Sequence, residues 1–536
     1  MPSAPQPRRA TPAASPARGP LGRSLNLFTD VRYGEVATAL LLMVNLILLL
    51  ASYYLLKTIR EPLILTGDGG GADVKSYSAA ATAGLLIILV PLYSALANRV
   101  SRVKLINGVT LFFISNLVVF FALSRIGVRI GVPFFIWVGV FNLVIIAQVW
   151  AFANDVYTVD QGQRLFAVVG LGASLGAIAG SFFTGRLVAA LGPYPFMMAA
   201  AAMLALSMVV TNIVHRREQA RETHSSNAPP PAQETRNGFA LVLSNRYLLL
   251  IAVLMMVLNL VNTTGEYILG ETVSKIAEAR AAQSGIDAEK MIGGFYGNFF
   301  TWVNLISAMV QALLVSRVIK HFGVRVALLV LPFVAFADYV TLAFLPLLSI
   351  IKTTKIAENS LDYSLQNTTR NALYLPTSRA AKYKAKQAND TFFVRFGDVL
   401  SAGVVFAGLH WFGLAPRQFA MVNAVLVVVW LEIALHRCYG RVLGIEAPVQ
   451  VEADVFALIF CSMPTPRQRA SSKSASSPST ISSSPCPGDS GSLWRTSPLA
   501  PLNHSTARCK RVDRYSQEAP APIAQEETKS VSSSSS

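Results

Sequence analysis

The sequence predicts an all-α membrane protein with twelve transmembrane helices, arranged as two six-helix halves related by a parallel internal repeat. The 536 residues are 53% hydrophobic and only 14% charged, well to the apolar side of ordinary globular usage. Apolar segments recur along the chain with the length of about 20 residues that crosses a hydrocarbon core of ~30 Å. A charged, Pro-rich segment, 215–236, divides these segments into two groups of six.

The net charge of +17 would suggest nucleic acid as a partner of a soluble chain. Most of the clustered basic residues, however, lie between or beyond apolar segments, where cytoplasmic loops concentrate Lys and Arg. We therefore interpret the charge as topology, with the lipid bilayer and not nucleic acid as the partner. The cysteines lie after the last clear span or in the tail, so we expect no disulfide, metal or redox cofactor in the bundle. They are Cys438, Cys461, Cys486 and Cys509.

Residues 1–33 are rich in Pro, Ala and Arg and have no acidic residue before Asp30. They contain no apolar core long enough for a secretory signal, so we expect a disordered basic arm. An organelle transit peptide is an alternative for such an acid-poor start. Positive-inside bias explains the same residues without one.

The first half, 34–214, holds six predicted spans. They are Val36–Leu56, Ser76–Asn98, Leu105–Ser124, Gly131–Asn154, Leu165–Ala190 and Tyr194–Val214. The loop Asn98–Lys104 and the exit of the sixth span are basic. Because basic loops stay on the cytoplasmic side, both loops and the N-terminus are expected there.

A cytoplasmic linker, 215–246, follows, with a short surface helix expected at its end, and then the second half, 247–440. Its spans are Tyr247–Leu269, Met291–Ser316, Val326–Ile351, a polar helix near 352–376, Phe392–Leu414 and Phe419–Leu435. The basic loop Arg317–Arg325 follows this half's second span, as Asn98–Lys104 follows that of the first, which is typical of a parallel repeat. Residues 441–536 are rich in Ser and Pro, so we expect a mostly disordered tail that transport does not need.

Glycines at four-residue spacing mark the fifth span, at Gly172, Gly176 and Gly180. Without side chains between them, two helix backbones can approach closely, so we predict tight helix packing there. Gly293, Gly294 and Gly297 open the eighth span in the same way.

The polar helix is the most unusual segment, because it is polar where its neighbours are apolar. At 3.6 residues per turn its polar residues form one stripe: Lys355, Asn359, Asp362, Gln366 and Arg370. A charge that faces lipid costs at least ~2.5 kcal/mol, so the stripe is expected to face a water-filled path or the bundle interior. A long cytoplasmic loop is the alternative interpretation.

Further charges occur at or inside apolar spans. Lys57, Arg60 and Glu61 follow the first span, where a simple helix end is the alternative to a functional site. Glu266 lies in the seventh span after Asn262, Thr263 and Thr264, and Gly265 would allow the helix to break there, as in many carriers. Asp338 stands alone in the ninth span. Arg395 and Asp398 have the i, i+3 spacing of an ion pair, which could be structural.

Mixed basic and acidic groups on facing helices suit an anionic substrate, because the acids compensate the cations when the site is empty. The candidate substrate-binding residues are Lys57, Arg60, Glu61, Asn262, Glu266, Lys355, Glu358, Asn359, Asp362, Gln366, Arg370, Arg395 and Asp398. We assign no catalytic and no metal-binding residue, and we expect no enzyme activity.

From about residue 40 to 440 the chain resembles the nucleotide transport proteins, the ATP/ADP translocases of plastids and intracellular bacteria, which are related to the major facilitator fold. Three motifs carry the resemblance: YYLLKTIREPLIL, VWAFANDVYTVDQGQRLFAVVGLGASLGAIAGS and ENSLDYSLQNTTRNALYLPTSRAAKYKAK. The family's lysine–aspartate pair after the first helix is matched by Arg60 and Glu61. Its acidic residue of the fourth helix is apolar here, near Val138, and that of the seventh corresponds to Asn262.

The resemblance implies a monomeric carrier that exchanges a nucleotide or a related phosphorylated anion by alternating access, in a bacterial inner membrane, with a plastid envelope as the alternative location. Two other functions stay open. One is proton-coupled transport of another small organic solute, which would respond to pH. The other is a non-transporting membrane sensor or scaffold, which would have a filled cavity.

Overall fold

The computed structural model describes residues 35–66, 69–97, 99–157, 159–219, 238–285, 287–345, 347–377 and 384–438. These residues form helices joined by short connections, with no strand among them. The chain divides into two units, 1–467 and 468–536, and every described helix belongs to the first unit. The predicted N-terminal arm, most of the linker and the tail lie outside the described residues.

The first half consists of six long helices. They are α2 (Val36–Leu65), α3 (Ala72–Ala97), α4 (Arg102–Arg125), α5 (Gly131–Val156), α6 (Val159–Leu191) and α7 (Pro195–Gln219). The expected short helix before the second half is present as α8 (Gly238–Ser244).

In the second half, several helices change between α-helical and π-helical geometry along their length. The described helices of this half are α9 (Arg246–Ser284), α10 (Ala288–Val310) with η2 (Gln311–Val315), α11 (Ser316–Phe344), α12 (Leu348–Leu361) with η3 (Asp362–Gln366) and α13 (Asn367–Ala372), α14 (Lys386–Ala388) with η5 (Asn389–Phe393) and α15 (Val394–His410), and α16 (Pro416–Cys438). The η segments are single π-helical turns, which are frequent at functional sites.

These helices are consistent with twelve crossings. Ten helical stretches of the described residues are long and apolar enough to span a membrane, and one of them, Ala288–Phe344, is 57 residues long. It contains two crossings, because Gly323 interrupts it with a φ of 75° and a single crossing needs about 20 residues. The polar helix α12–η3–α13 is the twelfth.

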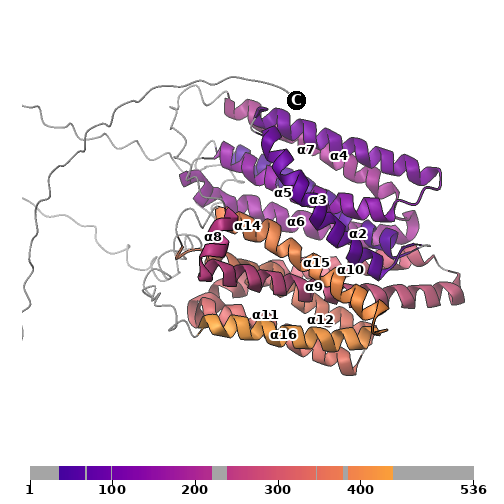
Figure 1. Cartoon of the computed structure of the whole chain (residues 1–536). Helices are drawn as coiled ribbons and strands as arrows, with labels where there is room; N and C mark the ends of the chain where they lie inside the picture. The colour runs from indigo at the N-terminus through magenta and orange to yellow at the C-terminus, as the bar shows by residue number, and fades with distance from the viewer. Residues whose placement is uncertain are drawn as a thin grey trace, which may run out of the picture. The chain divides into compact units, whose positions relative to one another are not determined.

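The two halves lie side by side (Figure 1), and the helix pairs that pack within each half follow an internal repeat. In the first half α2 packs against α6 and α7, and α4 packs against α7; in the second half α9 packs against α15 and α16, and α11 packs against α16. The halves meet through two equivalent pairs, α6 with α10 and α15 with α3. This is the two-half architecture predicted from the sequence.

Glycines make the closest helix approaches, as predicted. A Cβ atom on Gly176 would lie 2.4 Å from the Ile47 carbonyl oxygen, and one on Gly180 would lie 2.4 Å from that of Ala51, so α6 lies backbone to backbone on α2. A Cβ on Gly297 would lie 2.2 Å from the Cα of Gly185, which brings α10 equally close to α6 across the two halves.

Several predicted helix ends were wrong. The first helix continues past Leu56 to Leu65, and α9 continues through Gly265 to Ser284 without the expected break. The ninth span ends at Phe344, and the polar helix begins at Leu348. Hydropathy places an end at the first charge, whereas a helix continues through charges that turn inward to partners. The polar segment is helical, so the cytoplasmic-loop alternative was also wrong.

Candidate functional site

A cavity of ≈ 230 Å³ lies between the two halves. It is lined by α2, α3 and α5 of the first half and by α9, α10, the polar helix and α15 of the second. Its size is just below the ~300–1,000 Å³ of most ligand pockets. Eight of the thirteen candidate residues line it: Lys57, Arg60, Glu61, Asn262, Glu266, Asn359, Arg395 and Asp398.

The charged end of α2 forms one wall of the cavity. Because α2 continues to Leu65, Lys57, Arg60 and Glu61 lie inside a helix and not at its end. Arg60 Nε donates to Glu61 Oε1 at 3.0 Å, and the guanidinium lies 4.4 Å from the ring centre of Phe135.

Lys57 reaches across the cavity from the first half to the second. Its Nζ donates to the Tyr363 hydroxyl at 3.0 Å and lies 4.4 Å from the ring centre of Phe300. A lysine held by a hydroxyl and an aromatic face has no carboxylate to neutralise it there. It is therefore available to an anion in the cavity.

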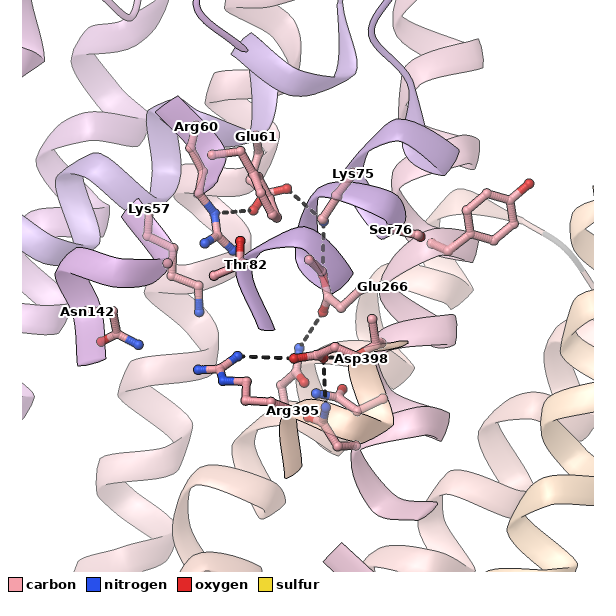
Figure 2. Close-up of a pocket in the computed structure, with 18 of the residues that line it drawn as sticks. Lys57, Arg60, Glu61, Lys75, Ser76, Thr82, Asn142, Glu266, Arg395 and Asp398 are labelled. Carbon is pink, nitrogen blue, oxygen red and sulfur yellow. Dashed lines mark hydrogen bonds and ion pairs between the residues drawn. The ribbon is translucent and has the colours of Figure 1, made fainter. Parts of the chain in front are cut away.

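Lys75 is the main cavity residue that the sequence analysis missed. Its Nζ lies 2.7 Å from Glu61 Oε2 and 3.4 Å from Glu266 Oε2, so it links α2 and α3 of the first half to α9 of the second (Figure 2). The prediction began the second span at Ser76, after this charge. The sequence feature that could have revealed it is a pair of charged residues, Asp73 and Lys75, directly before an apolar span.

The opposite wall carries the Arg395 and Asp398 pair of α15, drawn together in Figure 2. Arg395 Nη1 lies 3.1 Å from Asp398 Oδ2, as the i, i+3 spacing predicted. Asp398 Oδ1 also accepts from Asn259 at 2.7 Å and from Thr263 at 2.8 Å. Asp398 thus accepts hydrogen bonds from three side chains, whereas the buried Nε of Arg395 has no partner. Asn142, Asn259 and Thr263 are further lining residues that were not predicted.

The cavity carries an excess of positive charge. Four basic side chains line it, Lys57, Arg60, Lys75 and Arg395, against three acidic ones, Glu61, Glu266 and Asp398. In a site walled by apolar helices such an excess raises the local concentration of anions. The basic and acidic side chains lie on facing helices of the two halves.

The polar helix contributes less of the cavity surface than its stripe suggested. Asn359 lines the cavity and donates to Glu266 Oε1 at 3.2 Å. Lys355 and Glu358 lie behind the wall, paired at 2.8 Å. The remaining stripe residues lie further along the helix.

Those remaining residues are Asp362, Gln366 and Arg370. Asp362 Oδ1 lies 3.4 Å from Arg370 Nη2, and Gln366 is buried with neither amide atom hydrogen bonded. The π-helical turn Asp362–Gln366 rotates the residues that follow it relative to a regular α-helix. A stripe drawn at 3.6 residues per turn does not take this rotation into account.

Several contacts between the halves lie near the end that is expected to face away from the cytoplasm. Besides the Lys75 and Glu266 pair, Ser274 Oγ donates to the Leu65 carbonyl at 3.3 Å, and the Tyr194 hydroxyl donates to Glu289 at 3.4 Å. These residues lie at or near the α2–α3, α6–α7 and α9–α10 connections, which share one side of the membrane. These contacts therefore join the two halves on that side.

Comparisons with known proteins agree with this architecture. The model of the Major Facilitator Superfamily matches residues 25–356. ADP,ATP carrier protein 1 of Chlamydia trachomatis is 22% identical over 463 residues, which cover 71% of this chain and 84% of that protein. The protein of the same name in Chlamydia muridarum is 22% identical over 461 residues, with 71% and 83% covered.

Among solved structures, the nucleoside transporter NupG matches with a TM-score of 0.55 and 12% identity, covering 75% of this chain and 100% of that one. An auto-inhibited POT family peptide transporter matches with a TM-score of 0.51 and 13% identity, covering 79% and 100%. At these identities the likeness concerns the fold alone. The family match spans more than half of the chain, so the chain belongs to the Major Facilitator Superfamily and is a multi-pass membrane transporter of that type.

Proposed function

We propose that this chain carries a nucleotide, or a related phosphorylated organic anion, across a bacterial inner membrane in exchange for a second such anion. The observation that carries the proposal is the cavity between the halves, with four basic and three acidic side chains. Two of the basic residues are arginines, whose planar guanidinium groups bind phosphate through paired hydrogen bonds. The similarity to ADP,ATP carriers supports a nucleotide as the substrate.

Alternating access fits the contacts between the halves. The halves are joined near one end by the Lys75 and Glu266 pair, and a carrier must break such contacts to expose the cavity to the other side. We propose a single chain as the functional unit, because one chain provides both walls of the cavity. An open, charged cavity also favours transport over the sensor or scaffold function.

The test is exchange in reconstituted vesicles loaded with unlabelled ATP or ADP. Labelled ATP supplied outside is expected to enter loaded vesicles faster than empty ones, and an excess of unlabelled ADP is expected to suppress the signal. Equal entry into loaded and empty vesicles would exclude exchange. No entry of any nucleotide, with the protein inserted and folded, would exclude nucleotides as substrates.

A further inference from the structure

A second group of charged residues lies buried beside the cavity, between α11 and the polar helix. This Asp338 cluster consists of Asp338, Tyr339, Lys355 and Glu358, and Asp338 and Lys355 are 3% and 0% exposed. Lys355 Nζ lies 2.8 Å from Glu358 Oε2, and the Tyr339 hydroxyl lies 3.3 and 3.4 Å from the two Glu358 oxygens. No member of the cluster lines the cavity.

Asp338 is the member of the cluster without a partner. Neither of its carboxyl oxygens has a partner in hydrogen-bonding geometry, although the side chains of Thr354 and Glu358 are close enough to interact with it and Lys355 adds a positive charge nearby. Two carboxylates face one ammonium group here, so the cluster has one negative charge in excess. A buried charge without a partner costs several kcal/mol, and proteins avoid this cost by pairing or neutralising the group.

Among the residues that the structure describes, the other elements packed against α11 do not supply the missing positive charge. From α16, the uncharged Asn423 donates to a backbone carbonyl of α9, and Arg417 donates to a backbone carbonyl near the end of α11. In η3 and α13, Asp362 and Arg370 pair with each other. The turn η2 has no charged residue. Glu266 of α9, which faces the cavity, adds a further negative charge near Lys355.

Asn262 connects this cluster to the cavity. It lines the cavity, and its Oδ1 accepts from Lys355 Nζ at 3.4 Å. Gly265, one turn along α9, leaves the space for this contact, because a Cβ atom there would lie 2.8 Å from Lys355 Nζ. A change of charge in the cluster can therefore act on the cavity through one side chain.

We propose that the Asp338 cluster binds one proton on the Asp338 carboxyl group, and that this proton is the coupling ion of the carrier. The carboxylate accepts the proton from a hydronium ion, whose O–H bond breaks to leave water, and the Asp338 carboxyl group gains the new O–H bond. The coupling part rests on the proposed function. A polyanion that enters the cavity turns the net charge of the occupied cavity negative. A proton bound at Asp338 then lowers the negative charge that must cross the membrane interior.

The first experiment needs no substrate. An infrared titration of the reconstituted protein should show a protonated-carboxyl band that is lost in Asp338→Asn, whose amide has the shape of the protonated acid. Asp390→Asn is the matched control, because Asp390 pairs with Lys386 away from the cluster, and it should retain the band. A band that persists in Asp338→Asn would place the proton elsewhere and overturn the proposal.

A second variant tests the charge balance independently of how well Asp338→Asn folds. Glu358→Gln removes one negative charge, so Lys355 can pair with Asp338. The carboxyl band should then disappear although Asp338 is still present. An unchanged band in Glu358→Gln would contradict the argument from excess charge.

Coupling is tested with a pH-sensitive dye inside vesicles. The vesicles hold no counter-anion, because an anion that leaves with its own proton would cancel the signal. Uptake of the transported anion should then acidify vesicles with the parent protein and leave vesicles with Asp338→Asn at the background of protein-free ones. Acidification that accompanies another solute but never ATP would exclude the nucleotide and keep the proton site. No acidification with any transported solute, or an Asp338-dependent response to sodium at constant pH, would overturn the proton as coupling ion.

Discussion

The two basic residues of α2 differ in how firmly they are held. Arg60 is fixed by a hydrogen bond to Glu61 and by the ring of Phe135. Lys57 is held by a hydroxyl and by aromatic faces, and it acts as a point charge. A planar guanidinium group in a fixed orientation selects for phosphate geometry, whereas an ammonium group attracts any anion.

Arg60→Ala is expected to raise the apparent substrate constant for ATP roughly tenfold or more, because a charge-assisted contact contributes about 1.5–3 kcal/mol. Arg60→Lys should recover part of the loss. The measurement is the concentration dependence of ATP exchange in vesicles. Arg186→Ala is the control, since Arg186 also lies over a phenylalanine ring but does not line the cavity. An unchanged constant in Arg60→Ala would remove Arg60 from the binding site.

The charges of the cavity could be predicted from the sequence where they interrupt an apolar span or directly follow one. Glu266, Arg395 and Asp398 were found in this way. Lys75 precedes its span, so its inward orientation depends on where α3 begins. The partnerless state of Asp338 depends on the packing of α11 against the polar helix, which no spacing along the chain encodes.

At the scale of elements, the number of helices follows from hydropathy, but their ends and continuity follow from packing. Gly265 shows the difference. The sequence suggested a break there, yet α9 is continuous and the missing side chain provides space. A Cβ atom on Gly265 would lie 2.1 Å from the Tyr339 hydroxyl and 2.8 Å from Lys355 Nζ.

Gly265→Ala is therefore expected to destabilise the protein by about 1–3 kcal/mol through overpacking, although alanine is the better helix former by about 1 kcal/mol. The matched control is Gly403→Ala in α15, where a Cβ atom would have no neighbour within 4 Å. It should be neutral or stabilising. Thermal unfolding in detergent measures both. Equal melting temperatures for the two variants would mean that Tyr339 and Lys355 move away from the new methyl group without a loss of stability.

At the scale of the whole molecule, the two halves are nearly equivalent in packing but different in charge. The α2–α6 and α9–α15 pairs correspond, as do the α6–α10 and α3–α15 contacts between halves. The paired charges of Lys75 and Glu266 cross between the halves. Separating the halves on that side must separate these two charges, so their pairing contributes to the balance between the inward-open and outward-open states.

Lys75→Gln removes the ion pair between the halves and leaves Glu61 and Glu266 without their shared cation. The halves should then separate more often on that side, by roughly tenfold if the lost contact contributes ~1.5 kcal/mol. The measurement is the rate at which an impermeant maleimide labels Asn142→Cys from outside, in a chain whose four native cysteines are replaced. Lys275→Gln is the control, because it removes only an exposed pair with Glu271. Equal labelling of both variants would show that the Lys75 pair does not hold the halves together.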